Sequence, residues 1–125
     1  MPATVKDMLA AANAVVPRIS AAEAKALVGR PDVLFVDVRD GTEVQNGRVK
    51  GAVHAQRGLL EFKADPESPS HDKAFDRSKT IITYCGSGGR AALAGKTLKD
   101  FGYDNVKNLG GFKDWVEAGG EIEKS

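Results

Sequence analysis

Residues 80–102 read TIITYCGSGGRAALAGKTLKDFG, and the character of the chain changes at Cys85. The first part, TIITYC, is a β-branched and aromatic run that is typical of a buried strand. A glycine-rich turn follows, and then a helical pattern that places Leu98 and Phe101 on one face and ends at Gly102. A strand, a tight turn and a helix in this order predict an α/β fold.

The same alternation extends in both directions from this segment. VLFVDV, residues 33–38, is a run of mainly β-branched and aromatic residues that suits a strand buried on both faces, and hence a parallel sheet. In such sheets, ligands bind beyond the carboxyl ends of the strands, which is where Asp37 and Cys85 fall. Weaker patterns predict helices at 4–16, 21–28, 57–62 and 111–119, one or two helical turns at 40–46, strands at 52–55 and 105–109, and a polar surface excursion at 63–79.

The composition limits the function classes. A chain of 125 residues with 42% hydrophobic and 28% charged residues indicates one soluble domain whose core needs no disulfide. The formal net charge of +1 does not favour binding to nucleic acid or to an acidic membrane. Residues 1–20 lack the pattern of a signal peptide, and no apolar run approaches the about 20 residues of a membrane span. The single cysteine fits a reducing compartment, so we expect a cytoplasmic protein without nucleic-acid or membrane partners.

Cys85 is a candidate nucleophile because of its surroundings. Between a strand and a helix, backbone N–H groups and the positive end of the helix dipole point at the sulfur, which favours the thiolate. The glycines are expected to adopt the positive φ values of a tight arc, and the arginine adds a fixed charge. No histidine lies in the arc, so activation is expected to be electrostatic. The alternative is a small buried hydrophobe, which is common for a lone cysteine. The residues expected to bind a substrate around Cys85 are Gly86, Ser87, Gly88, Gly89 and Arg90.

Four segments together resemble the single-domain rhodanese family of sulfurtransferases. They are VDVRDGTE at 36–43, GRVKGAVH at 47–54, CGSGGR at 85–90 and NLGGFKDW at 108–115. The matching family patterns are Asp-x-Arg with a later glutamate, Gly-His-Ile-x-Gly-Ala-x-Asn, Cys-x-x-Gly-x-Arg, and a Gly-Gly-x-x-x-Trp block near the C-terminus. The second segment departs from its pattern, with arginine for histidine, valine for isoleucine and histidine for asparagine.

The resemblance implies a persulfide on Cys85. Such a protein takes sulfane sulfur from a small donor such as thiosulfate and passes it to a thiol or cyanide, or to an acceptor protein. His54 and His71 have no partner at metal-ligand spacing, so we expect neither a metal nor a cofactor. We expect a rhodanese-like α/β domain over residues 19–125, with a mostly parallel five-stranded sheet and helices on both faces, behind a helical extension at 1–18.

The length of the loop separates two chemistries. Cysteine phosphatases share this architecture but use a loop one residue longer, which wraps a whole phosphate. Four residues lie between Cys85 and Arg90, and this smaller arc suits a single sulfur atom. Two alternatives remain open: a non-enzymatic sulfur sensor or interaction module, against which the intact cysteine argues, and a phosphatase or arsenate reductase.

Further residues carry weaker expectations. Asp37 is expected either to support the loop by bonding its amides or to pair with a nearby arginine. Arg39, the second supporting residue, is four positions from Glu43 and is expected to pair with it across a short helix. Arg57 either reaches the pocket and binds an anionic donor, or stays solvated on the surface.

Overall fold

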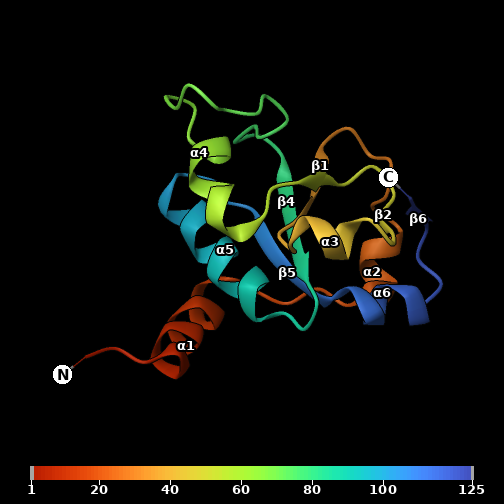
Figure 1. The fold of residues 1–125 in the computed structure, drawn as a ribbon, viewed down its shortest axis with the longest axis horizontal. Helices are drawn as coiled ribbons and strands as arrows, with labels where there is room; N and C mark the ends of the chain where they lie inside the picture. The colour runs from red at the N-terminus through yellow and green to blue at the C-terminus, as the bar shows by residue number, and fades with distance from the viewer. Residues whose placement is uncertain (1, 125) are drawn as a thin grey trace.

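The computed structural model describes residues 2–124 (Figure 1). None of the helices in this range is long and apolar enough to cross a membrane. In chain order the elements are α1 (Val5–Val15), α2 (Ala21–Lys25), β1 (Val33–Asp37), α3 (Gly41–Val44), β2 (Arg48–Val49), β3 (Val53–His54), the 3-10 helix η1 (Arg57–Leu59), α4 (Leu60–Ala64), β4 (Thr80–Cys85), α5 (Gly89–Asp100), β5 (Val106–Gly111), α6 (Phe112–Glu117) and β6 (Ile122–Glu123).

The central sheet is parallel and has the strand order β3-β1-β4-β5. In its register Asp37 at the end of β1 pairs with Tyr84, and Cys85 at the end of β4 pairs with Gly111 of β5. Because the strands are parallel, their carboxyl ends meet at one edge of the sheet. This confirms the parallel α/β class, and Asp37 and Cys85 lie at the same edge of the sheet.

The central sheet has four strands, so the expectation of five is wrong. At the free edge of β5, residues 2–124 make a single isolated bridge, between Arg18 and Asn108. Asn108 donates its N–H to the carbonyl of Pro17 at 2.9 Å, and Ile19 donates to the carbonyl of Asn108 at 3.1 Å. Pro17 has no N–H to extend the ladder, and Ser20 is already the N-cap of α2. The segment between them is too short for a fifth strand.

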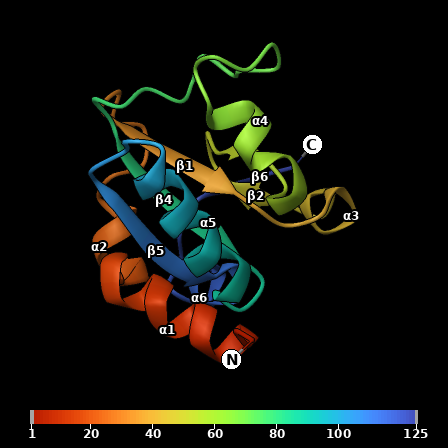
Figure 2. The same ribbon diagram turned by 90° about the vertical axis from the view of Figure 1, so that its left-hand side faces the viewer.

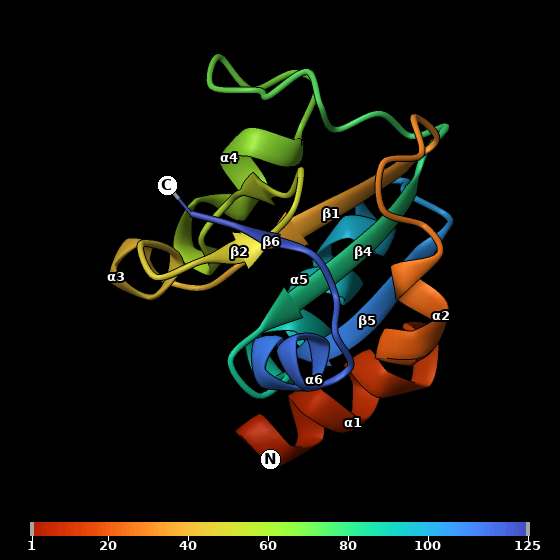
Figure 3. The same cartoon turned by 90° about the vertical axis from the view of Figure 1, so that its right-hand side faces the viewer.

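Helices cover both faces of the sheet, as predicted. Figure 2 shows α1, α4 and α5 on one side, and Figure 3 shows α2 and α6 on the other. The first face buries Leu34 and Ile81 against Leu98 of α5. The second buries Phe35 against Trp115 of α6, with their ring centroids 5.7 Å apart. The alternation of Leu34 and Phe35 between the two cores is the period of a strand buried on both faces.

A second, antiparallel sheet pairs β2 with β6, which the sequence analysis did not predict. Each strand has two residues, and Arg48 faces Glu123 across the pair. Arg48 Nε lies 3.4 Å from a carboxylate oxygen of Glu123, which also accepts the N–H of Gly51 at 3.0 Å. Strands this short carry no alternating pattern, so only the tertiary fold reveals them.

Candidate active site

Cys85 ends β4 and lies beneath the start of α5. Its side chain is buried, with 1% of the residue exposed. The backbone N–H of Gly88 points at Cys85 Sγ with an N-to-S distance of 2.9 Å. Gly88 is also the N-cap of α5, so the sulfur sits at the positive end of a twelve-residue helix. The strand-to-helix junction therefore presents an N–H donor to the sulfur.

The backbone of the loop differs in one respect from the expected arc. Of the three loop glycines, only Gly88 has a positive φ, at +103°. At Gly86 a Cβ would lie 3.2 Å from Arg90 Nη2, so this glycine provides room for the guanidinium. Gly89 faces Leu9 of α1, and Ser87 is exposed at the rim. One left-handed residue is enough to turn the chain from β4 into α5.

The end of β5 packs against this loop and holds it by hydrogen bonds. The side-chain amide of Asn108 donates to the carbonyl of Gly88 at 3.2 Å and accepts the N–H of Gly110 at 2.8 Å. A Cβ on Gly111 would lie 2.5 Å from the carbonyl oxygen of Gly86, so any side chain there would push the loop away. The Asn-Leu-Gly-Gly segment, residues 108–111, therefore packs against the loop and fixes its position. In the sequence this segment carries part of the family resemblance, but no pattern in it indicates this role.

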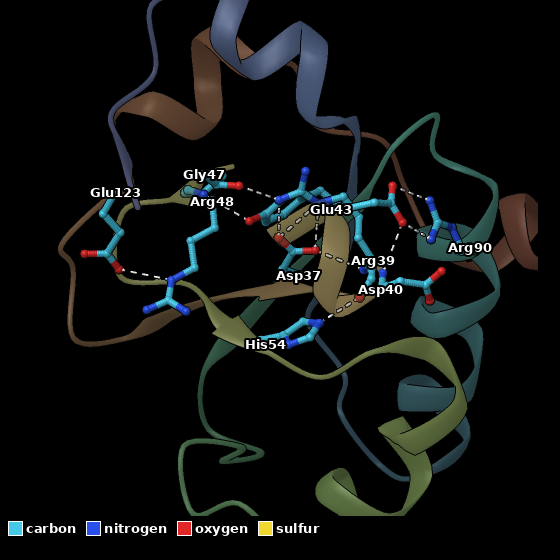
Figure 4. Close-up of polar contacts among 11 residues, drawn as sticks. Asp37, Arg39, Asp40, Glu43, Gly47, Arg48, His54, Arg90 and Glu123 are labelled. Atoms are coloured by element: carbon cyan, nitrogen blue, oxygen red, sulfur yellow. Dashed lines mark hydrogen bonds and ion pairs between the residues drawn. The ribbon is translucent and has the colours of Figure 1, made fainter. Parts of the chain in front are cut away.

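Arg90 pairs with a carboxylate at the rim of the loop (Figure 4). Its Nη1 donates to Glu43 Oε1 at 2.8 Å and its Nη2 donates to Glu43 Oε2 at 3.1 Å. The hydrogen bond from Arg90 lowers the pKa of Glu43 to about 2, although partial burial opposes the shift. The same bond raises the pKa of Arg90, and the nearby Cys85 adds a smaller electrostatic effect in the same direction. Glu43 therefore joins the candidate site through Arg90, whereas its spacing from Arg39 had predicted a different partner.

Asp37 and Arg39 form a buried ion pair beside the loop (Figure 4). Arg39 Nη2 donates to Asp37 Oδ2 and to the carbonyl of Gly47, both at 2.7 Å, and its guanidinium lies 4.3 Å from the ring centroid of Phe112. Of the two roles expected for Asp37, the structure has the arginine partner. The predicted Arg39–Glu43 pair is wrong, because Arg39 precedes the N-cap of α3 and is not part of the helix.

His54 and Tyr84 complete the polar layer behind this ion pair. His54 Nε2 lies 2.7 Å from the carbonyl oxygen of Arg39, and because a carbonyl only accepts, this nitrogen carries the proton. The Tyr84 hydroxyl accepts the N–H of Val49 at 3.0 Å. Burial raises the pKa of Tyr84, and the charge of Asp37 raises it further. Both side chains therefore have structural hydrogen bonds.

Arg57 lies on the flank of α5. Its Nη1 donates to Glu61 at 3.0 Å, and its Nη2 donates to the hydroxyl of Thr97 at 3.1 Å. It lines a cavity of about 200 Å³ between α1 and α5, together with residues that include Met8 and Leu93. Cys85 is not part of that lining. A role for Arg57 in donor binding stays a prediction. Within residues 2–124, no three metal-ligating side chains cluster closely enough to hold a metal ion.

Comparison with protein families identifies one match, the Rhodanese-like domain, over residues 20–118. Two solved structures are similar over nearly the whole chain. A protein of unknown function from Rhodopseudomonas palustris, described as a possible tyrosine phosphatase, is 41% identical with a TM-score of 0.88, covering 98% of this chain and 99% of that one. The polysulfide-sulfur transferase homodimer of Wolinella succinogenes is 33% identical with a TM-score of 0.74, covering 96% and 87%.

Curated relatives match the same region. A tRNA uridine(34) hydroxylase of Cytophaga hutchinsonii is 35% identical over 104 residues, which are 80% of this chain and 32% of the relative. The protein of that name from Escherichia coli is 31% identical over 124 residues, which are 95% of this chain and 31% of the relative. The chain therefore spans about a third of the length of these relatives.

Proposed function

Because the chain belongs to the rhodanese-like domain family and has its sulfurtransferase fold, we propose that it carries sulfane sulfur as a persulfide on Cys85. The observation that carries this proposal is the N–H of Gly88, 2.9 Å from Cys85 Sγ at the start of α5. Such donors stabilise a thiolate before the reaction and an anionic persulfide after it. The likeness to a polysulfide-sulfur transferase supports the same chemistry.

With thiosulfate as donor, the Cys85 thiolate attacks the outer, sulfane sulfur. A bond forms between the two sulfurs, the bond to the sulfonate sulfur breaks, and sulfite leaves with the electron pair. The product is Cys85–S–S⁻, so charge is conserved and no oxidant is needed. The second step is attack on the outer sulfur by cyanide, which gives thiocyanate, or by a thiolate, which gives a new persulfide; both regenerate the Cys85 thiolate.

The acceptor must come from outside the chain. Cys85 is the only cysteine, so no second thiol can resolve the persulfide internally. Gly86 and Ser87 are exposed at the rim of the loop and present little bulk to an incoming thiol. We therefore propose a small thiol such as glutathione, or a cysteine of a partner protein, as the physiological acceptor class.

Single-turnover transfer tests the proposal. Protein loaded with thiosulfate and desalted should lose its extra sulfur to glutathione, dithiothreitol and cyanide, and Cys85→Ser should give no product. Rapid loss to cyanide without loss to any thiol would contradict an open rim. Thiosulfate-loaded protein that yields no thiocyanate at all would overturn the proposed transfer.

A phosphatase is the second candidate, because the similar protein from Rhodopseudomonas palustris is described as a possible tyrosine phosphatase. The four-residue interval between Cys85 and Arg90 argues against it, since the arc is small for a phosphate tetrahedron. Aryl phosphate hydrolysis that depends on Cys85 would favour this candidate over sulfur transfer.

The curated relatives are named for tRNA, but they are about three times as long as the matched region. With a net charge of +1, we expect this chain to bind tRNA weakly or not at all. Fluorescence anisotropy of labelled tRNA at low salt checks this expectation, and tight binding there would contradict it.

A further inference from the structure

Glu43 pairs with Arg90, which ends the Cys85–Arg90 loop and lies at the loop's exposed edge, which we call the mouth. Both of its carboxylate oxygens accept from Arg90, at 2.8 Å and 3.1 Å. Glu43 is itself held, because its Oε1 also accepts the backbone N–H of Asp40 at 3.1 Å. The contact runs from the first turn of α3 to the first turn of α5, across 47 positions of sequence. A planar guanidinium bound through two nitrogens has little freedom to rotate.

The start of α3 is fixed in turn by the buried ion pair. Arg39, immediately before the N-cap Asp40, is locked onto Asp37 at 2.7 Å, and its carbonyl lies 2.7 Å from His54 Nε2. On the opposite side, Arg90 Nη2 packs over Gly86, where a Cβ would lie only 3.2 Å away. Arg90 is therefore held between a fixed carboxylate and the backbone of the loop.

The same contact sets the charge of the mouth. Glu43 carries its full negative charge at any pH of an ordinary assay, because the Arg90 hydrogen bond holds its pKa at about 2. Asp40 adds a second carboxylate that acts on Arg90 through space. Arg39 is turned away onto Asp37 and is buried. A doubly charged donor therefore meets Arg90 with its charge already offset, so the loop amides supply its main attraction.

We propose that Glu43 is a positioning residue that holds Arg90 at the mouth of the loop and offsets its charge, and thereby disfavours doubly charged donors such as thiosulfate relative to persulfides of lower net charge. This inference rests on the proposed sulfur transfer. Two of the five N–H groups of Arg90 are engaged by Glu43. The other N–H groups of Arg90 remain for a bound donor. Arg90 therefore keeps its binding role, while its electrostatic attraction for an anion is weakened.

Donor kinetics of Glu43→Gln test the inference. Glutamine has the shape of glutamate and keeps one acceptor oxygen, so Arg90 stays near its place while the offsetting charge is gone. We expect KM for thiosulfate to fall about three- to fivefold, the size of one charge at a partly exposed site, with kcat changed less than about twofold. KM for cysteamine persulfide, whose ammonium group balances its terminal sulfur, should stay within about twofold of wild type. KM for thiosulfate should also become more sensitive to salt.

Two controls make the test specific. Asp32→Asn removes the charge from another two-point arginine pair, Arg30–Asp32, which lies at the amino end of β1, and it should leave both KM values unchanged. Glu43→Gln in an Arg90→Ala background should have no effect on thiosulfate KM, because Glu43 acts through Arg90.

The inference is overturned if Glu43→Gln leaves thiosulfate KM unchanged, shifts both donors equally, or still acts without Arg90. A failure of the proposed function looks different, because the wild-type protein then transfers sulfur from neither donor. Glu43→Ala supplies an independent check. Because alanine offers no acceptor to hold Arg90, the kcat of the Glu43→Ala variant with thiosulfate should fall. An unchanged kcat would contradict the positioning role.

Discussion

Replacing Asp37 by asparagine should destabilise the protein severely, because it leaves a buried cation without its counterion. Both side chains are buried, with 0% of Asp37 and 6% of Arg39 exposed. Arg39 makes four hydrogen bonds to the two carboxylate oxygens, one from its backbone N–H and three from its guanidinium, at 2.7–3.1 Å. Asparagine keeps one acceptor oxygen and turns an NH₂ group toward a guanidinium that can only donate.

Breaking a buried pair by removing one partner costs about 3–5 kcal/mol. The remaining partners of the Arg39 guanidinium are the carbonyl of Gly47 and the rings of Phe112 and Tyr84, and none of them can replace a carboxylate. Against a typical total of about 5–15 kcal/mol, we expect Asp37→Asn to lose roughly a fifth or more of the stability and to lower Tm by roughly 10–20 °C.

Urea unfolding followed by circular dichroism at neutral pH measures this loss. Asp32→Asn is the matched control, since the Arg30–Asp32 pair is 55% and 58% exposed and should contribute less than about 1 kcal/mol. A loss of less than about 1 kcal/mol for Asp37→Asn, equal to the control, would refute the view that the Asp37 pair is desolvated and holds the end of β1.

Three further predictions follow from the loop and its rim. Gly111→Ala places a Cβ 2.5 Å from the carbonyl oxygen of Gly86, so it should lower the stability by about 1–3 kcal/mol and slow sulfur transfer. Gly58→Ala, whose Cβ would lie in open space, should change neither the stability nor the transfer rate. Equal effects in the two variants would contradict the close packing at Gly111. The pKa of Glu43 is lowered in the folded state to about 2, so its ion pair stabilises the fold fully above about pH 4.5 and less as the pH falls toward 2. The urea-measured stability gap between wild type and Glu43→Gln, below about 1 kcal/mol at neutral pH, should shrink over that range, and a constant gap would show that the pair does not titrate as described. One glycine inserted after Gly88 should enlarge the arc and weaken sulfur transfer in a thiosulfate assay, and undiminished transfer would mean that loop length does not select the chemistry.

The sequence predicted the elements that depend on local patterns. The runs at 33–38 and 80–85 could be assigned to buried strands because every position in them except Asp37 is apolar or β-branched. Cys85 could be placed at a strand end because glycines and a helical pattern follow it directly. The structure bears out both assignments, with β1 at Val33–Asp37 and β4 at Thr80–Cys85.

The contacts that complete the site could not be predicted, because they join distant segments. Spacing alone paired Arg39 with Glu43, but Arg39 lies outside α3, so the helical rule does not apply to it. The partner of Glu43 is Arg90, and no local pattern indicates that contact. The number of strands in the central sheet was also not predictable, because it depends on how Pro17 limits pairing at the edge of β5. The β2–β6 pair has strands of two residues, which are too short for periodicity to detect.

The central claim is that Cys85 accepts a sulfur atom, and intact-mass spectrometry tests it most directly. Wild-type protein incubated with thiosulfate and desalted should gain the mass of one sulfur atom and lose it on treatment with cyanide or dithiothreitol. Cys85→Ser, treated in the same way, should gain nothing. A wild-type protein that never gains this mass from thiosulfate, polysulfide or an organic persulfide, or a Cys85→Ser variant that gains it equally, would contradict the account.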